Sequence, residues 1–410
     1  MKNLINSLFT AVITLFLAVG VMAQSVTIDH NRPTGLNGVN VFEAPKTADN
    51  EFDEIRVLVG GDFAIQLQGL SQTNSGDSLG ELSNNFNLPT ANLNIDVQLE
   101  KGVRLHMRTY MSSKHHVEGW VKGGYIQFDN LDFIQEDFMA DFMQNFRIKV
   151  GMDDINYGDT HYRRSDNARA IYNPFVGNYL MDSFTTEPFM EFTYLKDEII
   201  GVFGVTNGRL NQRPTPGDDG FVVYGKLGYD SQINDDLRVR LTGSFYNSND
   251  EGTRDYLYGG DRAGSRYYRV ADGGDFDGRY NPRFPYQTAF QINPFVKFQG
   301  LEFFGVFENV SNGDDAGGGF TQLGAEVIYR LGEMENIFVG GRFNSISGEQ
   351  ADGASTREIS RLNIGAGWFL TNNVVAKFEY VTQTYDSGFD GSSLQGAEFD
   401  GWVIEAVIGF

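Results

Sequence analysis

Apolar and polar residues alternate with a period of two in many segments of the chain. From residue 91 to 99 the odd positions are alanine, leucine, isoleucine or valine, and the even positions are asparagine, aspartate or glutamine. This alternation is typical of a β-strand with one apolar face. Applied to the whole chain, it predicts sixteen strands, near residues 55–70, 91–99, 103–113, 119–131, 146–154, 188–196, 198–207, 220–230, 237–247, 288–298, 301–310, 320–330, 336–346, 359–370, 374–385 and 398–410.

The connections between these strands alternate in length. Most of the short ones lie at 100–102, 197, 231–236, 299–300, 331–335 and 371–373. The long ones between them are rich in glycine, aspartate and asparagine, and lie at about 71–90, 155–187, 208–219, 248–287, 311–319, 347–358 and 386–397. Two connections break the rule, at 114–118 and 132–145. Short periplasmic turns and long external loops are typical of transmembrane β-barrels, whose closed sheets leave no edge in lipid.

The last ten residues, GWVIEAVIGF, fit the strand that closes such a barrel. Trp402, Ile404, Ala406, Ile408 and Phe410 share one face, while Glu405 lies on the other. We therefore predict an all-β, antiparallel transmembrane barrel over residues 55–410, with the apolar face on lipid. A large soluble β-sandwich or a secreted repeat protein would explain the alternation, but not the unequal connections or the terminal aromatic residue.

The N-terminus has the pattern of a secretory signal peptide. Lys2 precedes an apolar run from about residue 8 to 21, and a small-residue site ends at Ala23. We expect cleavage after residue 23; an uncleaved membrane anchor is the alternative. Residues 24–54 are predicted to form an N-terminal periplasmic segment, and their sequence does not choose between a tail, a plug and an added strand. After residue 24 no apolar run approaches the roughly 18 residues that a spanning helix needs.

Composition narrows the classes of function. The chain has no cysteine, so disulfides, thiolate metal sites and cysteine nucleophiles are excluded. The formal net charge of −22 argues against a nucleic-acid partner, because phosphate binding needs basic protein surface. The 49 glycines and the 14% aromatic residues favour a large β structure over disorder.

The chain resembles the bacterial general and specific porins. The resemblance rests on the terminal Phe410 with alternating apolar residues before it, on the sixteen strands and on the long third loop. The stretch FRIKVGMDDINYGD (146–159) resembles the phosphate-selective O/P type of porin, although that family's basic residues cannot be matched one to one here. The resemblance implies an inward-folding third loop at about 155–187, a homotrimer, and insertion by the barrel-assembly machinery through the C-terminal strand.

The alternation also predicts which charged residues face the pore. The predicted pore-lining cations are Arg104, Arg108, Arg147, Lys149, Lys226, Arg238, Arg240, Lys297, Arg342 and Lys377, with Arg361 on the same face. The predicted inward acids are Asp62, Asp96, Asp153, Glu191, Glu302, Glu308, Glu326, Glu379 and Glu405. Basic residues dominate the first nine strands, so we expect a basic wall that faces a more acidic one.

The third loop adds three candidates for a constriction, Arg163, Arg164 and Arg169. Arginine suits bidentate contacts with phosphate or carboxylate oxygens. Two interpretations stay open. These arginines narrow the pore and favour anions, or they pair with Asp159, Asp166 and Asp182 and fix the loop. The fifth loop (248–287) contains six arginines and is expected to form a solvated lid, to cap the mouth or to contact another subunit.

No enzyme, metal or cofactor motif stands out. His115 and His116 are adjacent in an expected external loop, and their side chains would point apart. The aspartate- and glycine-rich stretches 271–278 and 311–319 fit turns better than calcium sites. No spacing links a serine, a histidine and an acid as a catalytic triad.

Together these features predict a porin in the outer membrane of a Gram-negative bacterium. Small hydrophilic solutes would diffuse passively through it, with a preference for anions such as phosphate or carboxylates. The expected partners are outer-membrane lipid, lipopolysaccharide and the solutes themselves. A barrel enzyme acting on lipid or peptide, and an adhesion or assembly barrel with binding loops, are the alternatives from other classes.

Overall fold

The computed structural model describes residues 27–46, 51–111, 119–208, 221–248, 257–259, 268–270 and 278–410. The predicted signal peptide (1–23), His115, His116 and most of the charged part of the fifth loop lie outside these ranges. Within them, no helix is both long and apolar enough to cross a membrane.

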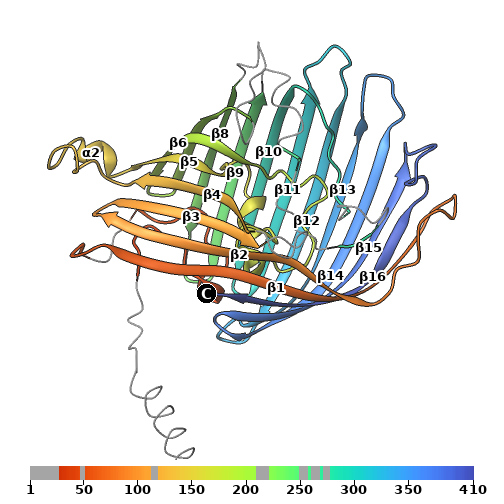
Figure 1. The fold of residues 1–410 in the computed structure, drawn as a ribbon, viewed down its shortest axis with the longest axis horizontal. Coiled ribbons are helices and arrows are strands. Elements are labelled where there is room, and N and C mark those ends of the chain that lie inside the picture. Colours follow the sequence, from red (N-terminus) through yellow and green to blue (C-terminus); the bar gives the residue numbers. More distant parts are fainter. Residues whose placement is uncertain are drawn as a thin grey trace, which may run out of the picture.

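The described residues form sixteen strands in one closed antiparallel barrel (Figure 1). Each strand pairs with its neighbours in sequence, and β1 closes the ring on β16. The predicted sixteen-stranded barrel is therefore confirmed. The strands are β1 (Arg56–Thr73), β2 (Asn85–Glu100), β3 (Val103–Met111), β4 (Gly119–Phe128), β5 (Phe146–Asp154), β6 (Thr186–Lys196), β7 (Ile199–Thr206), β8 (Val222–Gln232), β9 (Leu237–Ser248), β10 (Gln287–Phe298), β11 (Leu301–Asn312), β12 (Gly319–Leu331), β13 (Ile337–Glu349), β14 (Arg357–Thr371), β15 (Val374–Ser387) and β16 (Glu398–Gly409).

Some strand ends differ from those expected from the sequence. β2 begins at Asn85 rather than at residue 91, because its pairing with β1 continues past a register shift between Ala64 and Gln66. β4 ends at Phe128 rather than at 131, where the chain enters a long turn. The expected strand at 103–113 is described only as far as Met111.

The two faces of each strand meet different surroundings. On β16, Ile404 and Ile408 are 47% and 46% exposed on the outer wall, whereas Val403 and Val407 are fully buried. Glu405 is 1% exposed and points inward with them. Apolar side chains thus form an outer band that suits lipid, and most charged side chains in the middle of the strands lie on the inner face. The chain end joins the wall, since Phe410 and Gly61 exchange two backbone hydrogen bonds of 2.8 and 3.0 Å.

The two ends of the barrel differ. At one end, called the short-turn end, most connections are brief, and the 129–145 connection with the short helix α2 (Ala140–Met143) projects sideways (Figure 1). At the other end the connections are long. The third of these, residues 155–185, is called the inner loop because it turns back into the barrel; it contains η2 (Thr160–Arg163) and η3 (Ala170–Tyr172). Nearly all of its residues are buried.

The outer band generates a prediction about how deep its residues lie in the bilayer. Val327 is 47% exposed near the middle of β12, and Leu331 is 40% exposed on the same face at the strand's end. Arginine in place of Val327 should lower the free energy of unfolding by about 2–4 kcal/mol, because the charge lies near the bilayer midplane. Leu331→Arg should cost about 0–1 kcal/mol. Urea unfolding in lipid vesicles measures both, and equal losses would contradict this placement of the band.

Candidate functional site

The inner loop crosses the barrel because buried charges hold it at both sides. Asp159 is fully buried and accepts hydrogen bonds of 2.8 Å from Lys226 of β8, from Arg240 of β9 and from Thr242 of β9. On the opposite wall, Lys377 of β15 donates to the carbonyl of Ala170 at 3.0 Å. A loop buried in this way needs such partners for its polar groups. The inner loop therefore divides the interior between the long-loop end and the short-turn end.

The three arginines of the inner loop are paired. Arg164 binds Asp182 at 2.8 Å and Asp166 at 2.9 Å, which is the pairing expected if it fixes the loop. Arg163 lies 2.6 Å from Glu326 of β12. Arg169 lies 2.6 Å from Asp154 at the end of β5. Carboxylates largely balance these three charges, and their role in a constriction stays a prediction.

Four of the predicted pore-lining cations hold the inner loop in place. Lys226 and Arg240 do so through Asp159. Arg342 of β13 donates to the carbonyl of Gly177 at 2.7 Å and pairs with Glu326, also at 2.7 Å. Lys377 also pairs with Glu405 at 2.5 Å. All four are at most 3% exposed, so they face the interior as expected, but they contact protein there.

Residues 27–46, called the N-terminal segment, cross the short-turn end of the barrel. They contain η1 (Gly35–Gly38) and no strand. Arg32 donates to the carbonyl of Tyr162 at 2.9 Å and lies 3.6 Å above the Tyr172 ring, so it joins the segment to the inner loop. The backbone amide of Leu36 donates to the carbonyl of Asn372, in the turn between β14 and β15, at 2.8 Å. This described part of the predicted periplasmic segment 24–54 thus contacts the interior of the barrel.

Charged groups tie the N-terminal segment to the first half of the wall as well. Glu43 lies 2.8 Å from Arg240. Burial alone would raise the pKa of Glu43, but the charges of Arg240 and Lys226 outweigh it and lower the pKa to about 2. Lys46 donates to Asp129, just beyond β4, at 3.1 Å. Arg147 of β5 pairs with the same carboxylate at 2.9 Å and donates to the carbonyl of Ala44 at 2.8 Å.

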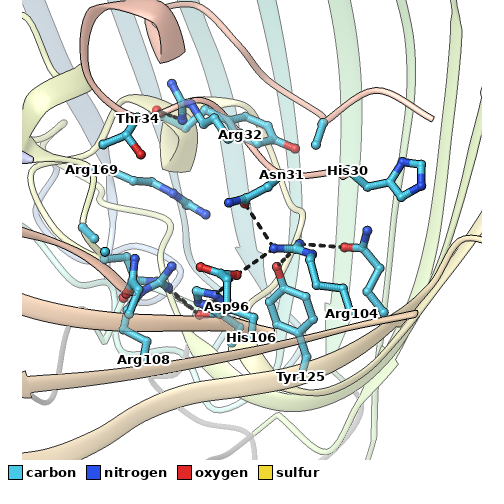
Figure 2. A pocket seen from close by; sticks show the side chains of 18 of the residues that line it. His30, Asn31, Arg32, Thr34, Asp96, Arg104, His106, Arg108, Tyr125 and Arg169 are labelled. Carbon is cyan, nitrogen blue, oxygen red and sulfur yellow. Dashed lines mark hydrogen bonds and ion pairs between the residues drawn. The ribbon is translucent and has the colours of Figure 1, made fainter. Parts of the chain in front are cut away.

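A cavity of about 150 Å³ lies between the N-terminal segment and the wall formed by the first strands (Figure 2). We call it the basic cavity. Its lining includes six cationic side chains, Arg32, Arg104, Arg108, Arg147, Lys149 and Arg169. It includes three carboxylate side chains, Glu43, Asp96 and Asp153. Four of the predicted pore-lining cations, from β3 and β5, therefore meet in one place.

The cations of the basic cavity differ in how firmly they are paired. Arg104 donates to Asp96 at 2.8 Å and to the hydroxyl of Tyr125 at 3.0 Å, as Figure 2 shows. Arg108 donates to Asp153 at 2.9 Å. The Lys149 ammonium lies 3.8 Å from its carboxylate partner, Glu191, and its side chain is 25% exposed. Lys149 is thus more weakly paired and more accessible than either arginine.

A second cavity lies on the other side of the N-terminal segment, at the turns of β8 to β13. Its volume is about 660 Å³, and we call it the mixed cavity. Predicted pore-lining residues Arg238 and Lys297 border it. Arg238 pairs with Asp230 at 2.7 Å, and Lys297 pairs with Glu335. The charged side chains that line it are Arg238, Lys297, Arg330, Asp235, Asp236, Glu333 and Glu335.

Sequence reasoning missed three inward cations. Arg330 shares the inner face of β12 with Glu326, four residues earlier, and pairs with Glu302 at 2.7 Å; the alternation itself could have revealed it. Lys122 lies at a register shift in the pairing of β3 with β4 and turns inward to Asp166, against simple alternation. Arg32 belongs to a segment with no periodic pattern, and nothing in the sequence pointed to it.

No group of three histidine, aspartate or glutamate side chains in the described ranges has the arrangement of a metal site. The inner-loop residue His161 is fully buried, and burial together with the nearby Lys226 charge lowers its pKa to about 3. Its imidazole is therefore neutral near pH 7 and adds no positive charge to the interior.

Comparison with known proteins supports the architecture. No protein-family model matches the sequence, and no curated protein is significantly similar to it. Among solved structures, an anion-selective porin from Comamonas acidovorans is similar with a TM-score of 0.56 and 10% identity, over 87% of this chain and 100% of that one. The trimer form of OmpT, an outer membrane protein of Vibrio cholerae, has a TM-score of 0.53 and 11% identity over 87% and 100% of the chains. The outer membrane channel DcaP of Acinetobacter baumannii has a TM-score of 0.52 and 12% identity over 87% and 97%. At these identities the likeness establishes the fold alone.

The anchoring of the inner loop can be tested at Asp159. Alanine at this position would leave the Lys226 and Arg240 charges buried with fewer partners, and should lower the free energy of unfolding by about 3–5 kcal/mol. Asp315→Ala, at an exposed position of the connection between β11 and β12, should change it by less than about 0.5 kcal/mol. Denaturant titration in detergent measures both values. Similar small losses for the two variants would show that this cluster does not hold the loop.

Proposed function

We propose that this protein is a porin of a Gram-negative outer membrane that allows small hydrophilic solutes to diffuse passively, with a preference for anions such as phosphate or carboxylates. The observation that carries the proposal is the basic cavity, where six cationic side chains face three carboxylate side chains. Arg147 and Arg169 pair with Asp129 and Asp154, which lie outside this lining, so the positive surplus rests mainly on Lys149 and Arg32. Such a surplus in a narrow, low-dielectric passage raises the local concentration of anions.

The architecture supports passage through the barrel. Sixteen strands enclose a lumen wide enough for an aqueous path, and the inner loop and the N-terminal segment reduce it to smaller cavities. Solved barrels of the same fold include an anion-selective porin and an outer membrane channel. In this proposal the chain is not an enzyme, and it acts as a homotrimer, as one similar structure does.

In the proposed passage, Lys149 and the arginines have different roles. Arg104 and Arg108 keep carboxylate partners, so their net field is small at a distance. The Lys149 ammonium is weakly paired and accessible, and it can give a passing carboxylate or phosphate a transient partner. Weak binding suits conduction, because an ion must also leave.

A second candidate is an adhesion or assembly barrel whose long loops bind partners. The observation in its favour is how much of the interior is occupied, since the inner loop is buried nearly throughout. A barrel of this kind would conduct no steady current. Recording from purified, folded protein in a planar bilayer therefore separates the two candidates.

The charge on Lys149 generates the selectivity prediction. Lys149→Glu should lower the chloride-to-potassium permeability ratio by about threefold or more, since one charge about 5 Å from an ion in water changes its energy by roughly 1 kcal/mol. Lys149→Ala should have a smaller effect in the same direction. Reversal potentials under a KCl gradient give the ratios.

The matched control is Lys101→Glu, in the turn between β2 and β3, where the side chain is 73% exposed. It should leave the permeability ratio within error of the wild type, because bulk water and salt screen the charge. A cation-selective wild type would contradict the anion preference, and an unchanged ratio in Lys149→Glu would contradict the role given to Lys149.

A further inference from the structure

We propose that the N-terminal segment, residues 27–46, is the element that determines ion selectivity, by forming a floor that separates the basic cavity from the mixed cavity. This inference rests on the proposed porin function and assigns the choice of path to one segment. The floor confines solutes to the basic cavity and closes the path through the mixed cavity, at the turns of β8 to β13.

The first observation is the position of the segment between the two cavities. Arg32, Phe42 and Glu43 line the basic cavity. Figure 2 shows Arg32 above the wall residues Asp96, Arg104 and Tyr125. Leu36, Val39 and Asn40 of the same segment line the mixed cavity. One short stretch of chain thus forms a shared wall of both spaces.

The second observation is that the two cavities differ in the balance of cationic and carboxylate side chains that line them. The basic cavity has six cationic and three carboxylate side chains. The mixed cavity has three cationic and four carboxylate side chains. The segment itself is neutral, because Arg32 and Lys46 balance Asp29 and Glu43. Its influence on selectivity therefore comes from separating the two spaces, and removing it does not change the net charge of the barrel.

The third observation is that the floor is firmly held across its whole length. Phe42 is 3% exposed and packs with its ring centroid 5.6 Å from Tyr162 and 5.5 Å from Phe295. Asn40 donates to Glu302 of β11 at 2.5 Å, and the carbonyl of Asn40 accepts from Arg238 at 3.0 Å. These contacts reach β9 to β11, while Leu36 contacts the turn between β14 and β15 and Lys46 contacts Asp129 beyond β4, so the segment is held at three parts of the wall.

The wall keeps other partners when the segment is removed. Arg240 retains Asp159 and Asp230. Arg147 retains Asp129, Arg238 retains Asp230, and Glu302 retains Arg330. No wall charge among these is left buried without a counter-charge, so the barrel should still fold.

The experiment compares the wild type with a variant that lacks residues 27–46 but keeps residues 1–26. The deletion should raise single-channel conductance about twofold or more, because the two cavities join and the open cross-section grows. The chloride-to-potassium permeability ratio should fall toward one, because ions gain access to the mixed cavity, where carboxylates outnumber cationic side chains. A triple variant, Arg32→Ala with Glu43→Ala and Lys46→Ala, releases the charged anchors without a deletion and should move both values in the same direction.

Lys101→Ala, in an exposed turn at the same end of the barrel, serves as the control and should change neither value. If the deletion variant and the triple variant both keep the wild-type conductance and permeability ratio, the floor is overturned and the porin proposal stays intact. If only the deletion variant conducts, the floor is supported, and passive diffusion through the full-length protein is overturned. Absence of current in all the folded proteins would overturn both proposals.

Discussion

The rest of this structure depends on the closure of a hydrogen-bonded sheet. A strand in lipid has no water to satisfy its backbone amides and carbonyls, so each strand needs a partner on both sides. β1 and β16 supply the last pair over twelve residues, from Asp62 opposite Gly409 to Thr73 opposite Glu398. Once the ring is closed, one face of every strand meets lipid and the other meets the interior. The alternation of apolar and polar residues follows from that geometry.

Closure creates a second constraint, because charged side chains gather in a confined interior. A buried charge without a counter-charge is costly, and a buried pair is tolerable when further hydrogen bonds satisfy it. Two segments of the chain enter the interior and supply counter-charges there. The inner loop brings Asp159 to Lys226 and Arg240, and the N-terminal segment adds Glu43 to the same group. The filling of the barrel and the pairing of its charges are therefore one structural solution.

The sequence predicts the strands of the barrel wall better than the segments that fill the interior. Alternation depends on local geometry, so it placed the inward side of Glu405, Arg342 and Lys377 correctly, and it failed at Lys122, where a register shift reverses the faces. The pairing of Arg163 with Glu326 joins residues 163 positions apart, and no periodic signal encodes it. The same holds for the N-terminal segment, whose place was open between a tail, a plug and a strand. Contacts between distant segments decide it.

Selectivity in such an interior depends on residual charge more than on the number of charges. Two opposite charges less than 3 Å apart, such as Arg108 and Asp153, largely cancel at the distance of a passing ion. A long list of inward arginines therefore says little about the field in a passage. What counts is the surplus along the open path, together with weakly paired groups such as Lys149. Any segment that decides which wall borders the path then decides the sign of that surplus, even when the segment is itself neutral.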